Sequence, residues 1–373
     1  MTSDLPVLVT GACGFSGSHL VKHLLARGEH VVASDLEHAF RDDRRRAVLE
    51  RIGLDLKHPS LDVRPADLTD RRSLERLFTS RYDVIFHTAS LYDYSAPLER
   101  LRLLNVAHFE SLLDLVVADP PGRFVHWSTC GVFGRPCRLS HPRSNAPFTE
   151  DSPSPRNTPF GASGPAGTTL ANDYSVSKWE QEQLAWKVHR ERGLPLTVIR
   201  PAPIYGPGSE YGHMGIVLAV HRGLLPAIPA DARNHVTVSV HVEDLARFAL
   251  HAARHPEALG EDYNVVDDSV ISHAELVRYI ALLCGRRVIE VSLVRLESLK
   301  PLVVQAARTW AWLARHHRLP RVRMLEPGSA VYLGSSYWIQ NEKSKSLGFE
   351  YRYPDVRVGL RDSIRWMRDA GWM

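Results

Sequence analysis

The chain has 373 residues, of which 44% are hydrophobic and 24% charged, a composition typical of folded globular proteins with a large core. Its formal net charge of +4 is small for this length, so composition gives no indication of nucleic-acid binding. The sequence has no apolar run long enough to cross a membrane and no signal-peptide pattern at its start. We therefore expect neither a membrane span nor a leader.

The first 200 residues alternate short β-branched runs with longer amphipathic segments, a pattern typical of β-α-β units and a parallel sheet. The predicted strands are Val7–Thr10, Val31–Asp35, Leu61–Pro65, Val84–His87, Phe124–Ser128 and Leu196–Arg200. The predicted helices between them are Phe15–Arg27, Arg71–Phe78, Leu98–Val117 and Tyr174–Arg192. We therefore expect an α/β fold with a doubly wound parallel sheet.

A stretch rich in Pro, Ser, Gly and Asn, residues 135–172, interrupts this alternation. It is too long for an ordinary connection between two elements. We expect it to be a surface excursion near the active site.

Beyond Arg200 the alternation becomes less regular. Val236–Val240 and Asp262–Val266 are predicted to be late strands that return to the sheet, with a helix at Glu243–His255 between them. Further predicted helices are His273–Cys284, Leu296–Arg315 and Val356–Arg368. We expect a cofactor domain over 1–200, its sheet completed by about 236–267, and a smaller substrate-binding portion over 201–235 and 268–373.

The cysteines are few and irregularly spaced, at Cys13, Cys130, Cys137 and Cys284. This pattern fits neither a disulfide framework nor a zinc site, and the 19 histidines also lack metal-ligand spacing. We expect no metal and a reducing, cytoplasmic compartment. Cys13 and Cys130 are predicted to be small buried residues near the cofactor.

Three glycines, Gly11, Gly14 and Gly17, follow the first predicted strand and open the first helix. Glycines in this pattern allow a tight turn, close approach of the backbone to a pyrophosphate, and close helix–strand packing. The helix N-terminus then offers free N–H groups to the phosphates. Asp35 closes the second strand 18 residues after Gly17, where a carboxylate binds ribose hydroxyls and repels a 2′-phosphate. The sequence predicts a Rossmann-type NAD site, with NAD favoured over NADP.

Tyr174 and Lys178 lie four residues apart on a predicted helix, so both side chains project from one face. An ammonium and a positive nicotinamide ring near a phenol would favour the phenolate and lower the pKa of the tyrosine. The predicted strand that ends at Ser128 is followed by Thr129, which supplies a hydroxyl donor. These three residue types together predict acid–base chemistry at a carbon–oxygen bond.

Taken in order, these motifs resemble the extended short-chain dehydrogenases/reductases over almost the whole chain. This group includes sugar-nucleotide epimerases and dehydratases, 3β-hydroxysteroid dehydrogenases and dihydroflavonol reductases. Besides the residues above, the resemblance rests on Asp67-Leu68, His87-Thr88-Ala89, Asn105-Val106, Arg200-Pro201, Tyr205-Gly206-Pro207-Gly208 and His241-Val242-Glu243-Asp244-Leu245-Ala246.

The resemblance implies a role for each matching residue. Thr129 would hydrogen-bond the substrate oxygen, Tyr174 would exchange its proton, Lys178 would bind the nicotinamide ribose and tune the tyrosine, and Asn105 would support the site. Asp67 and Leu68 would lie at the adenine, and the segment from Pro201 to Ile204 beside the nicotinamide. The expected cofactor-binding residues are Gly11, Cys13, Gly14, Phe15, Ser16, Gly17, Asp35, Asp67, Leu68, Thr88, Ala89, Ser90, Ser128, Tyr174, Lys178, Pro201 and Ile204.

Departures from the family pattern indicate the branch. Cys130 and Gly131 stand where dehydratases and decarboxylases place acidic or polar residues, so elimination chemistry lacks a side chain. Pro203 and Thr237 stand where many epimerases have an Asn and an Arg. Without those two side chains, charge-assisted recognition of a diphosphate is weakened.

The C-terminal part is similar to the tail of 3β-hydroxysteroid and sterol-carboxylate dehydrogenases, from Leu319-Pro320 through Tyr337-Trp338 to Glu342–Phe349. The helix before it, Leu302 to Arg315, is apolar enough to line a pocket for a hydrophobic substrate. Alternatively, Trp310 and Trp312 pack in the core or form a dimer seam. The basic stretch from Arg315 to Arg323 could instead rest on an anionic membrane surface.

The leading hypothesis is an NAD-dependent dehydrogenase or reductase for a secondary alcohol or ketone on a hydrophobic, sterol-like substrate. The alternatives are a nucleotide-sugar epimerase that recycles its NAD, and a non-catalytic sensor that only binds dinucleotide. The family resemblance implies a homodimer through helices flanking Leu98–Val117 and Tyr174–Arg192.

Overall fold

A parallel sheet forms the centre of the protein. The computed structural model describes residues 5–135, 147–317, 332 and 334–373. The seven strands follow the order β11-β6-β5-β4-β1-β2-β3, and every neighbouring pair is parallel. The strands are β1 Val7–Thr10, β2 Val31–Ser34, β3 Leu61–Val63, β4 Val84–His87, β5 Arg123–Trp127, β6 Leu196–Pro201 and β11 Glu261–Val265. The predicted doubly wound α/β fold is confirmed.

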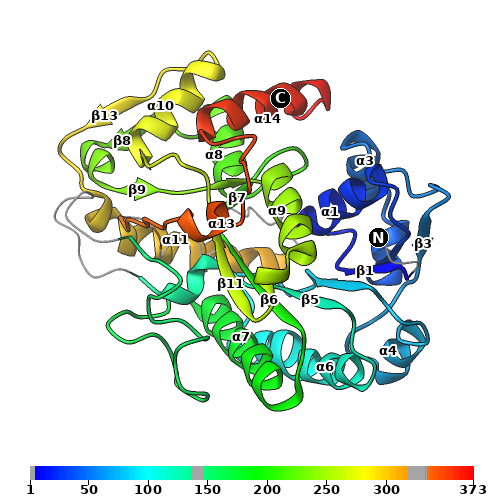
Figure 1. Ribbon diagram of the computed structural model, residues 1–373. Helices are drawn as coiled ribbons and strands as arrows, with labels where there is room; N and C mark the ends of the chain where they lie inside the picture. The colour runs from blue at the N-terminus through cyan, green and yellow to red at the C-terminus, as the bar shows by residue number, and fades with distance from the viewer. Residues whose placement is uncertain (1–4, 136–146, 318–331, 333) are drawn as a thin grey trace.

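Helices cover both faces of this sheet (Figure 1). One face carries α1 Phe15–Ala26 and α9 Val242–Arg254, and the other carries α4 Arg71–Leu77, α6 His108–Ala118 and α7 Asp173–Arg192. Side chains alternate along each strand, so β1 sends Val7 and Val9 into one hydrophobic cluster and Leu8 into the other. The two clusters hold the three layers together.

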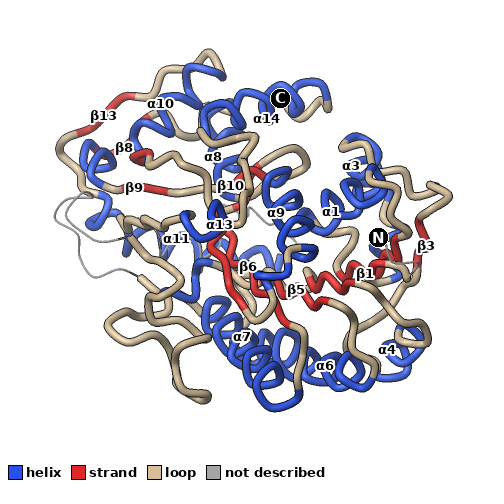
Figure 2. Tube along the Cα trace, in the orientation of Figure 1, coloured by secondary structure: helices blue, strands red, loops and turns tan. Residues whose placement is uncertain are grey.

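Segments from the second half of the chain build a smaller lobe beside the sheet, in the upper left of Figure 2. Helices α8 Gly212–His221, α10 His273–Leu283 and α14 Val356–Asp369 share one hydrophobic cluster there. A short parallel pair, β8 Ala227–Pro229 and β13 Ile289–Val291, lies at its edge. The division into a cofactor domain and a substrate-binding portion stays a prediction.

The prediction for Val236–Val240 was wrong. Its first two residues form β9 Val236–Thr237, which pairs antiparallel with β12 Ile271–Ser272. Its last residue begins β10 Val240–His241, which pairs with β7 Ile204–Tyr205. The hydrogen bonds of the two pieces go to different partners outside the central sheet, and only the second late strand, β11, joins it.

The predicted helix Leu98–Val117 is divided by one wider turn. It begins as α5 Leu98–Arg102, continues as a π-helical turn over Leu103–Ala107, and ends as α6. The remaining helices are α2 Glu37–Arg41, α3 Asp43–Arg51, α11 Leu296–His317 and α13 Glu342–Ser346, with short 3₁₀ turns at Cys130–Phe133, Ala230–Asn234 and Pro256–Ala258. A π turn carries one extra residue and is frequent at functional sites.

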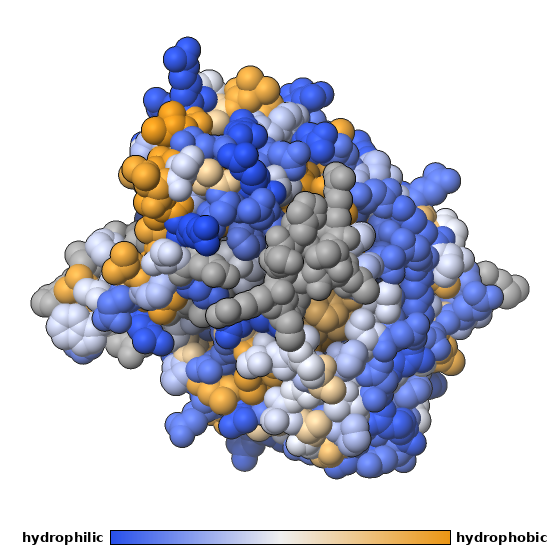
Figure 3. All heavy atoms as spheres, turned by 90° about the vertical axis from the view of Figure 1, so that its left-hand side faces the viewer, coloured by the Kyte–Doolittle hydropathy of each residue, from blue (hydrophilic) through white to orange (hydrophobic). Residues whose placement is uncertain are grey.

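Apolar side chains are exposed on the face of the small lobe that carries β13 (Figure 3). Ile289 is 64% and Leu293 is 96% exposed. On α11, Trp312 is 56% exposed and stacks on His316, so the core alternative does not hold for this tryptophan. None of the helices in the described part of the chain is both long and apolar enough to span a membrane. The basic stretch predicted over Arg315–Arg323 lies outside the described residues beyond His317.

Candidate functional site

The glycine loop between β1 and α1 has the close contacts that the motif predicts. Gly11 has φ of +70°, and a Cβ there would lie 2.8 Å from the backbone nitrogen of Ala89. A Cβ on Gly17 would lie 2.1 Å from the carbonyl oxygen of Gly11, and one on Gly14 would lie 3.0 Å from the same oxygen. Larger residues do not fit this turn, which places the N-terminus of α1 next to the strand ends.

Asp35 lies directly after β2 and faces this loop. Its Oδ2 accepts a hydrogen bond of 2.9 Å from the backbone N–H of Cys13, and its Oδ1 accepts one of 2.8 Å from Leu36. These two hydrogen bonds hold the carboxylate against the glycine turn. This arrangement fits a dinucleotide with a free ribose diol.

The other predicted cofactor residues follow the ends of neighbouring strands. The Thr88 hydroxyl donates to the carbonyl oxygen of Thr10 at 2.7 Å and so joins the ends of β4 and β1. Asp67 caps the turn after β3, where its Oδ1 accepts from the amide and hydroxyl of Thr69. The predicted cofactor residues of this region therefore lie along one edge of the sheet. They are Phe15, Ser16, Asp67, Leu68, Thr88, Ala89 and Ser90.

Thr129 stands at the end of β5, at the N-cap of the 3₁₀ turn Cys130–Phe133. Its Oγ1 accepts a hydrogen bond of 3.1 Å from the amide of Gly131. Because the hydroxyl accepts in this bond, its hydrogen can be donated to a substrate oxygen. A Cβ on Gly131 would lie 3.1 Å from Oγ of Ser175 and 3.4 Å from Oγ1 of Thr129, so this turn meets the start of α7. The fold therefore brings Thr129 next to the helix that carries Tyr174.

Tyr174 is 9% exposed and enclosed by other tyrosines. Its ring makes edge contacts with Tyr92 and Tyr94, at centroid distances of 5.1 and 5.3 Å. Burial, with Tyr92 and Tyr332 nearby, raises the pKa of Tyr174 above its ordinary value. Lys178 is not among the groups that change this pKa, and the predicted lowering by a bound nicotinamide ring stays a prediction. The phenol is protonated at neutral pH.

Lys178 points into the protein rather than to solvent. Its Nζ donates a hydrogen bond of 2.6 Å to the carbonyl oxygen of Trp127 and another to Oε1 of Gln181. Burial lowers the pKa of Lys178 to about 7, and the charge of Glu182 opposes that change. Lys178 thereby fastens α7 to the last residue of β5.

Asn105 occupies the π-helical turn and is fully buried. Its side-chain amide accepts from the backbone nitrogen of Leu91 at 2.7 Å and donates to its carbonyl oxygen at 3.2 Å. It also donates to Oγ of Ser177 at 3.1 Å. Asn105 therefore connects the segment after β4 with α7, which agrees with a supporting role.

The predicted nicotinamide border, Pro201 to Ile204, spans the end of β6 and the start of β7. The carbonyl oxygen of Pro203 accepts from the amide of Val240, and the Thr237 hydroxyl donates to the carbonyl oxygen of Val238. Both of these polar groups take part in local backbone pairing. Neither residue has the amide or guanidinium side chain that many epimerases have at these two positions.

Cys13 and Cys130 are buried, as predicted, at 5% and 3% exposed. Burial raises the pKa of Cys13 to about 12 and also raises that of Cys130. Cys137 lies outside the described residues. In the described ranges no group of three or more His, Cys, Asp or Glu side chains could hold a metal ion.

Part of the excursion after β5 lies against α7, and an earlier part contacts β11 through Glu150 and Arg156. Trp179 and Gln183 on the helix donate to the carbonyl oxygens of Ala162 and Pro159, at 2.7 and 3.0 Å. It therefore lies near the site, as predicted.

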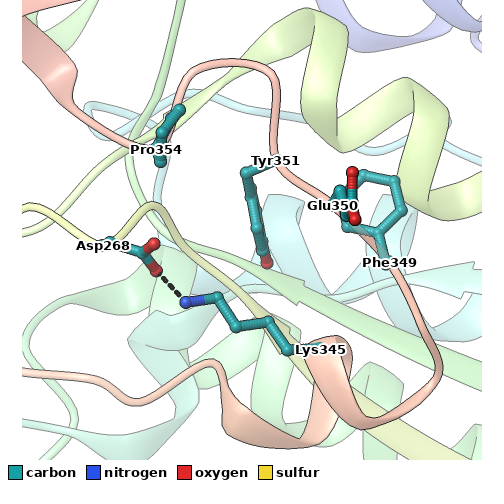
Figure 4. Close-up of a pocket in the computed structure, with 6 residues that line it drawn as sticks. All are labelled: Asp268, Lys345, Phe349, Glu350, Tyr351 and Pro354. Atoms are coloured by element: carbon teal, nitrogen blue, oxygen red, sulfur yellow. Dashed lines mark hydrogen bonds and ion pairs between the residues drawn. The ribbon is translucent and has the colours of Figure 1, made fainter.

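A shallow pocket of about 390 Å³ opens elsewhere, between the loop after β11 and the chain after α13. Figure 4 shows Lys345 reaching across it to Asp268, with Tyr351 beside them. The lining residues are Asp268, Lys345, Phe349, Glu350, Tyr351 and Pro354. None of them belongs to the predicted site.

Sequence reasoning missed two sets of residues at the site. The first is the tyrosine group of Tyr92, Tyr94 and Tyr332, and the second is the buried Glu182. Tyr92 and Tyr94 follow the end of β4, where ligands bind in such sheets, and Glu182 is four residues after Lys178. The sequence positions of Tyr92, Tyr94 and Glu182 could therefore have indicated them. Nothing in the sequence indicated Tyr332.

The comparison with known proteins agrees with this geometry. The model of the "NAD dependent epimerase/dehydratase family" matches residues 7–265. The UDP-glucose 4-epimerase of Vibrio cholerae is 25% identical over 281 residues, 74% of this chain and 75% of the relative. Other relatives are also UDP-glucose 4-epimerases.

Two relatives of other activities align over more of the chain. The dTDP-4-dehydro-6-deoxy-D-allose reductase of Streptomyces bikiniensis is 26% identical, over 97% of this chain and 96% of the relative. The 3-beta-hydroxysteroid dehydrogenase of Mycolicibacterium neoaurum is 25% identical, over 92% and 86%. Among solved structures, the UDP-glucose 4-epimerase of Thermotoga maritima superposes with a TM-score of 0.69 at 20% identity, covering 98% of this chain and 99% of the other. That likeness supports the fold.

Proposed function

The chain belongs to the NAD-dependent epimerase/dehydratase family, and from that premise we propose that it interconverts a secondary alcohol and a ketone on a hydrophobic, sterol-like substrate. It is an enzyme of the extended short-chain dehydrogenase/reductase type, and NAD is its cofactor. The glycine turn and Asp35 fit this cofactor, because a Cβ at Gly11 or Gly17 would close the turn.

The surroundings of Tyr174 carry the substrate proposal. The phenol lies among aromatic edges, and Tyr92, which contacts Tyr174, Tyr94 and Tyr211, is also 43% exposed. Aromatic edges suit an apolar ring better than a diphosphate, which needs cations. Pro203 has no polar side chain and Thr237 carries no charge, which supports the same choice.

In the reductive direction, the Tyr174 hydroxyl gives its proton to the substrate oxygen as the carbonyl carbon is reduced. The raised pKa of Tyr174 keeps that proton in place until negative charge develops on the oxygen. Thr129 donates a second hydrogen bond to the same oxygen. The reduced form of the bound cofactor, NADH, would supply the hydride in this direction. In the oxidative direction NAD would accept a hydride, and Tyr174 in its phenolate form would take the hydroxyl proton.

A nucleotide-sugar epimerase is the second candidate. The names of the relatives favour it over the sterol candidate, because most of those above act on UDP-glucose. The acid–base step at Tyr174 is the same in both candidates. They differ in substrate and in whether NADH leaves the enzyme.

The test is absorbance in the NADH band after mixing the protein, NAD and a 3β-hydroxysteroid, with a nucleotide-sugar mixture in a parallel cell. A steady rise with the steroid alone supports the sterol candidate. Sugar interconversion without net NADH supports the epimerase. No change in either cell, with NAD bound, would reject both substrate classes.

A further inference from the structure

A fully buried carboxylate lies beneath the predicted reaction residues. Glu182 on α7 and Arg200 on β6 are both 0% exposed, and Oε1 of Glu182 accepts from Nη2 of Arg200 at 2.6 Å. The same oxygen accepts from Nε1 of Trp186 at 3.1 Å, and Oε2 accepts from the hydroxyl of Ser128. Such a buried charge needs partners that hold it in one geometry.

The helical spacing places Glu182 in line with the reaction residues. Tyr174, Lys178 and Glu182 are four residues apart along α7, so they follow one another on the same face. Lys178 bonds to the carbonyl of Trp127, and Glu182 bonds to the hydroxyl of Ser128. Two successive turns of α7 are thus joined to two successive residues at the end of β5, directly before Thr129.

We propose that Glu182 is a positioning residue, which holds Thr129 in register with Tyr174 through Ser128 and presents a negative charge to Lys178. The other titratable groups that face this ammonium are His87 on β4 and His126 on β5. Burial holds the pKa of both histidines well below the ordinary value, so both are neutral at pH 7. The charge of Glu182 raises the pKa of Lys178 and so opposes the effect of burial on that pKa.

The positioning role is tested by Ser128→Ala, which removes the hydrogen bond to Glu182 and leaves its pairing with Arg200. The matched control is Ser154→Ala, which removes a buried hydroxyl 3.3 Å from Nη2 of Arg200 without touching β5. We expect Ser128→Ala to lower kcat by about tenfold or more, because the reacting groups lose register. The control should keep kcat.

A second measurement does not depend on turnover. It therefore separates this inference from the proposed function, on which the kcat comparison rests. The amide of Gly131 bonds to Oγ1 of Thr129, so its hydrogen exchange should be faster in Ser128→Ala than in Ser154→Ala. Equal exchange and equal kcat in the two variants would overturn the positioning role.

The charge role is tested by Glu182→Gln, with Glu150→Gln as the matched control. Glu150 is also buried and accepts from the amide of Asn264. An NMR titration of the Lys178 side-chain nitrogen should give a lower midpoint in Glu182→Gln than in wild type, and an unchanged one in the control. A wild-type midpoint in a folded Glu182→Gln protein would overturn this role, and if that variant does not fold, the two serine variants decide the proposal.

Discussion

The backbone N–H of Cys13 donates a hydrogen bond of 2.9 Å to Oδ2 of Asp35, so the acid that ends β2 is held against the glycine turn. Replacing Asp35 with Asn removes the charge and keeps the size. We expect weaker NAD binding and stronger NADP binding, because the ribose diol loses a charged acceptor and a 2′-phosphate is no longer repelled. The ratio of the two Kd values should change by about tenfold or more. Calorimetry measures both constants, and an unchanged ratio would contradict the assignment of Asp35.

Tyr174→Phe keeps the ring among Tyr92 and Tyr94 and removes the hydroxyl. We expect turnover to fall by roughly 10²-fold or more, with the Kd for NAD unchanged, because the proton donor is lost and the cofactor contacts are not. Tyr337→Phe is the control, since the buried hydroxyl of Tyr337 has no hydrogen-bond partner among the described residues. Retained turnover in Tyr174→Phe would remove this residue from its role.

Gly17→Ala tests the close contact in the glycine turn. The added Cβ would lie 2.1 Å from the Gly11 carbonyl oxygen, so the turn or the start of α1 must move. We expect a loss of about 2 kcal/mol or more in the free energy of unfolding, and weaker NAD binding. In Gly164→Ala the nearest atoms lie 3.5 and 3.6 Å from the new Cβ, an ordinary contact. Chemical denaturation measures the free energy of unfolding of both variants. Equal values would show that the turn is not close-packed.

The buried amine of Lys178 predicts a stability change with pH. Its pKa falls from the ordinary 10.5 to about 7 because of burial. Between these values the unfolded chain binds a proton that the folded chain does not, so this contribution to folding increases as pH rises. We expect the free energy of unfolding of wild type, relative to Lys178→Met, to rise across this interval by at most about 1.4 kcal/mol per pH unit. Urea denaturation at several pH values measures it, and a constant difference would contradict the lowered pKa.

Much of the fold could be predicted from local patterns. Val7–Thr10 and Val84–His87 were predicted with the bounds that the structure has, because strands buried on both faces consist of apolar runs that end at turn residues. The glycine turn and the Tyr174–Lys178 spacing are local as well. Each could be read within a few residues of sequence.

What could not be predicted depends on contacts between distant segments. Val236–Val240 has the composition of a strand, but sequence does not show that its ends pair with β12 and β7. Tyr332 reaches the site from the C-terminal part, where its hydroxyl lies 3.3 Å from that of Ser175. The raised pKa of Tyr174 in the protein alone also depends on distant segments, since burial causes it first and the nearby Tyr92 and Tyr332 add to it.

The π-helical turn around Asn105 has a consequence for the permitted length of the chain. One surplus residue in Leu103–Ala107 lets the amide of Asn105 reach Leu91 and Ser177 while Leu112 and Leu113 still face the sheet. A deletion of one residue beside Asn105 would remove the surplus and restore the ordinary helical pitch, with Leu112 and Leu113 still facing the sheet. The amide of Asn105 would then lose the wider turn that presents it to Leu91 and Ser177. We therefore expect such a deletion to leave the core packed and to disrupt the support of the site.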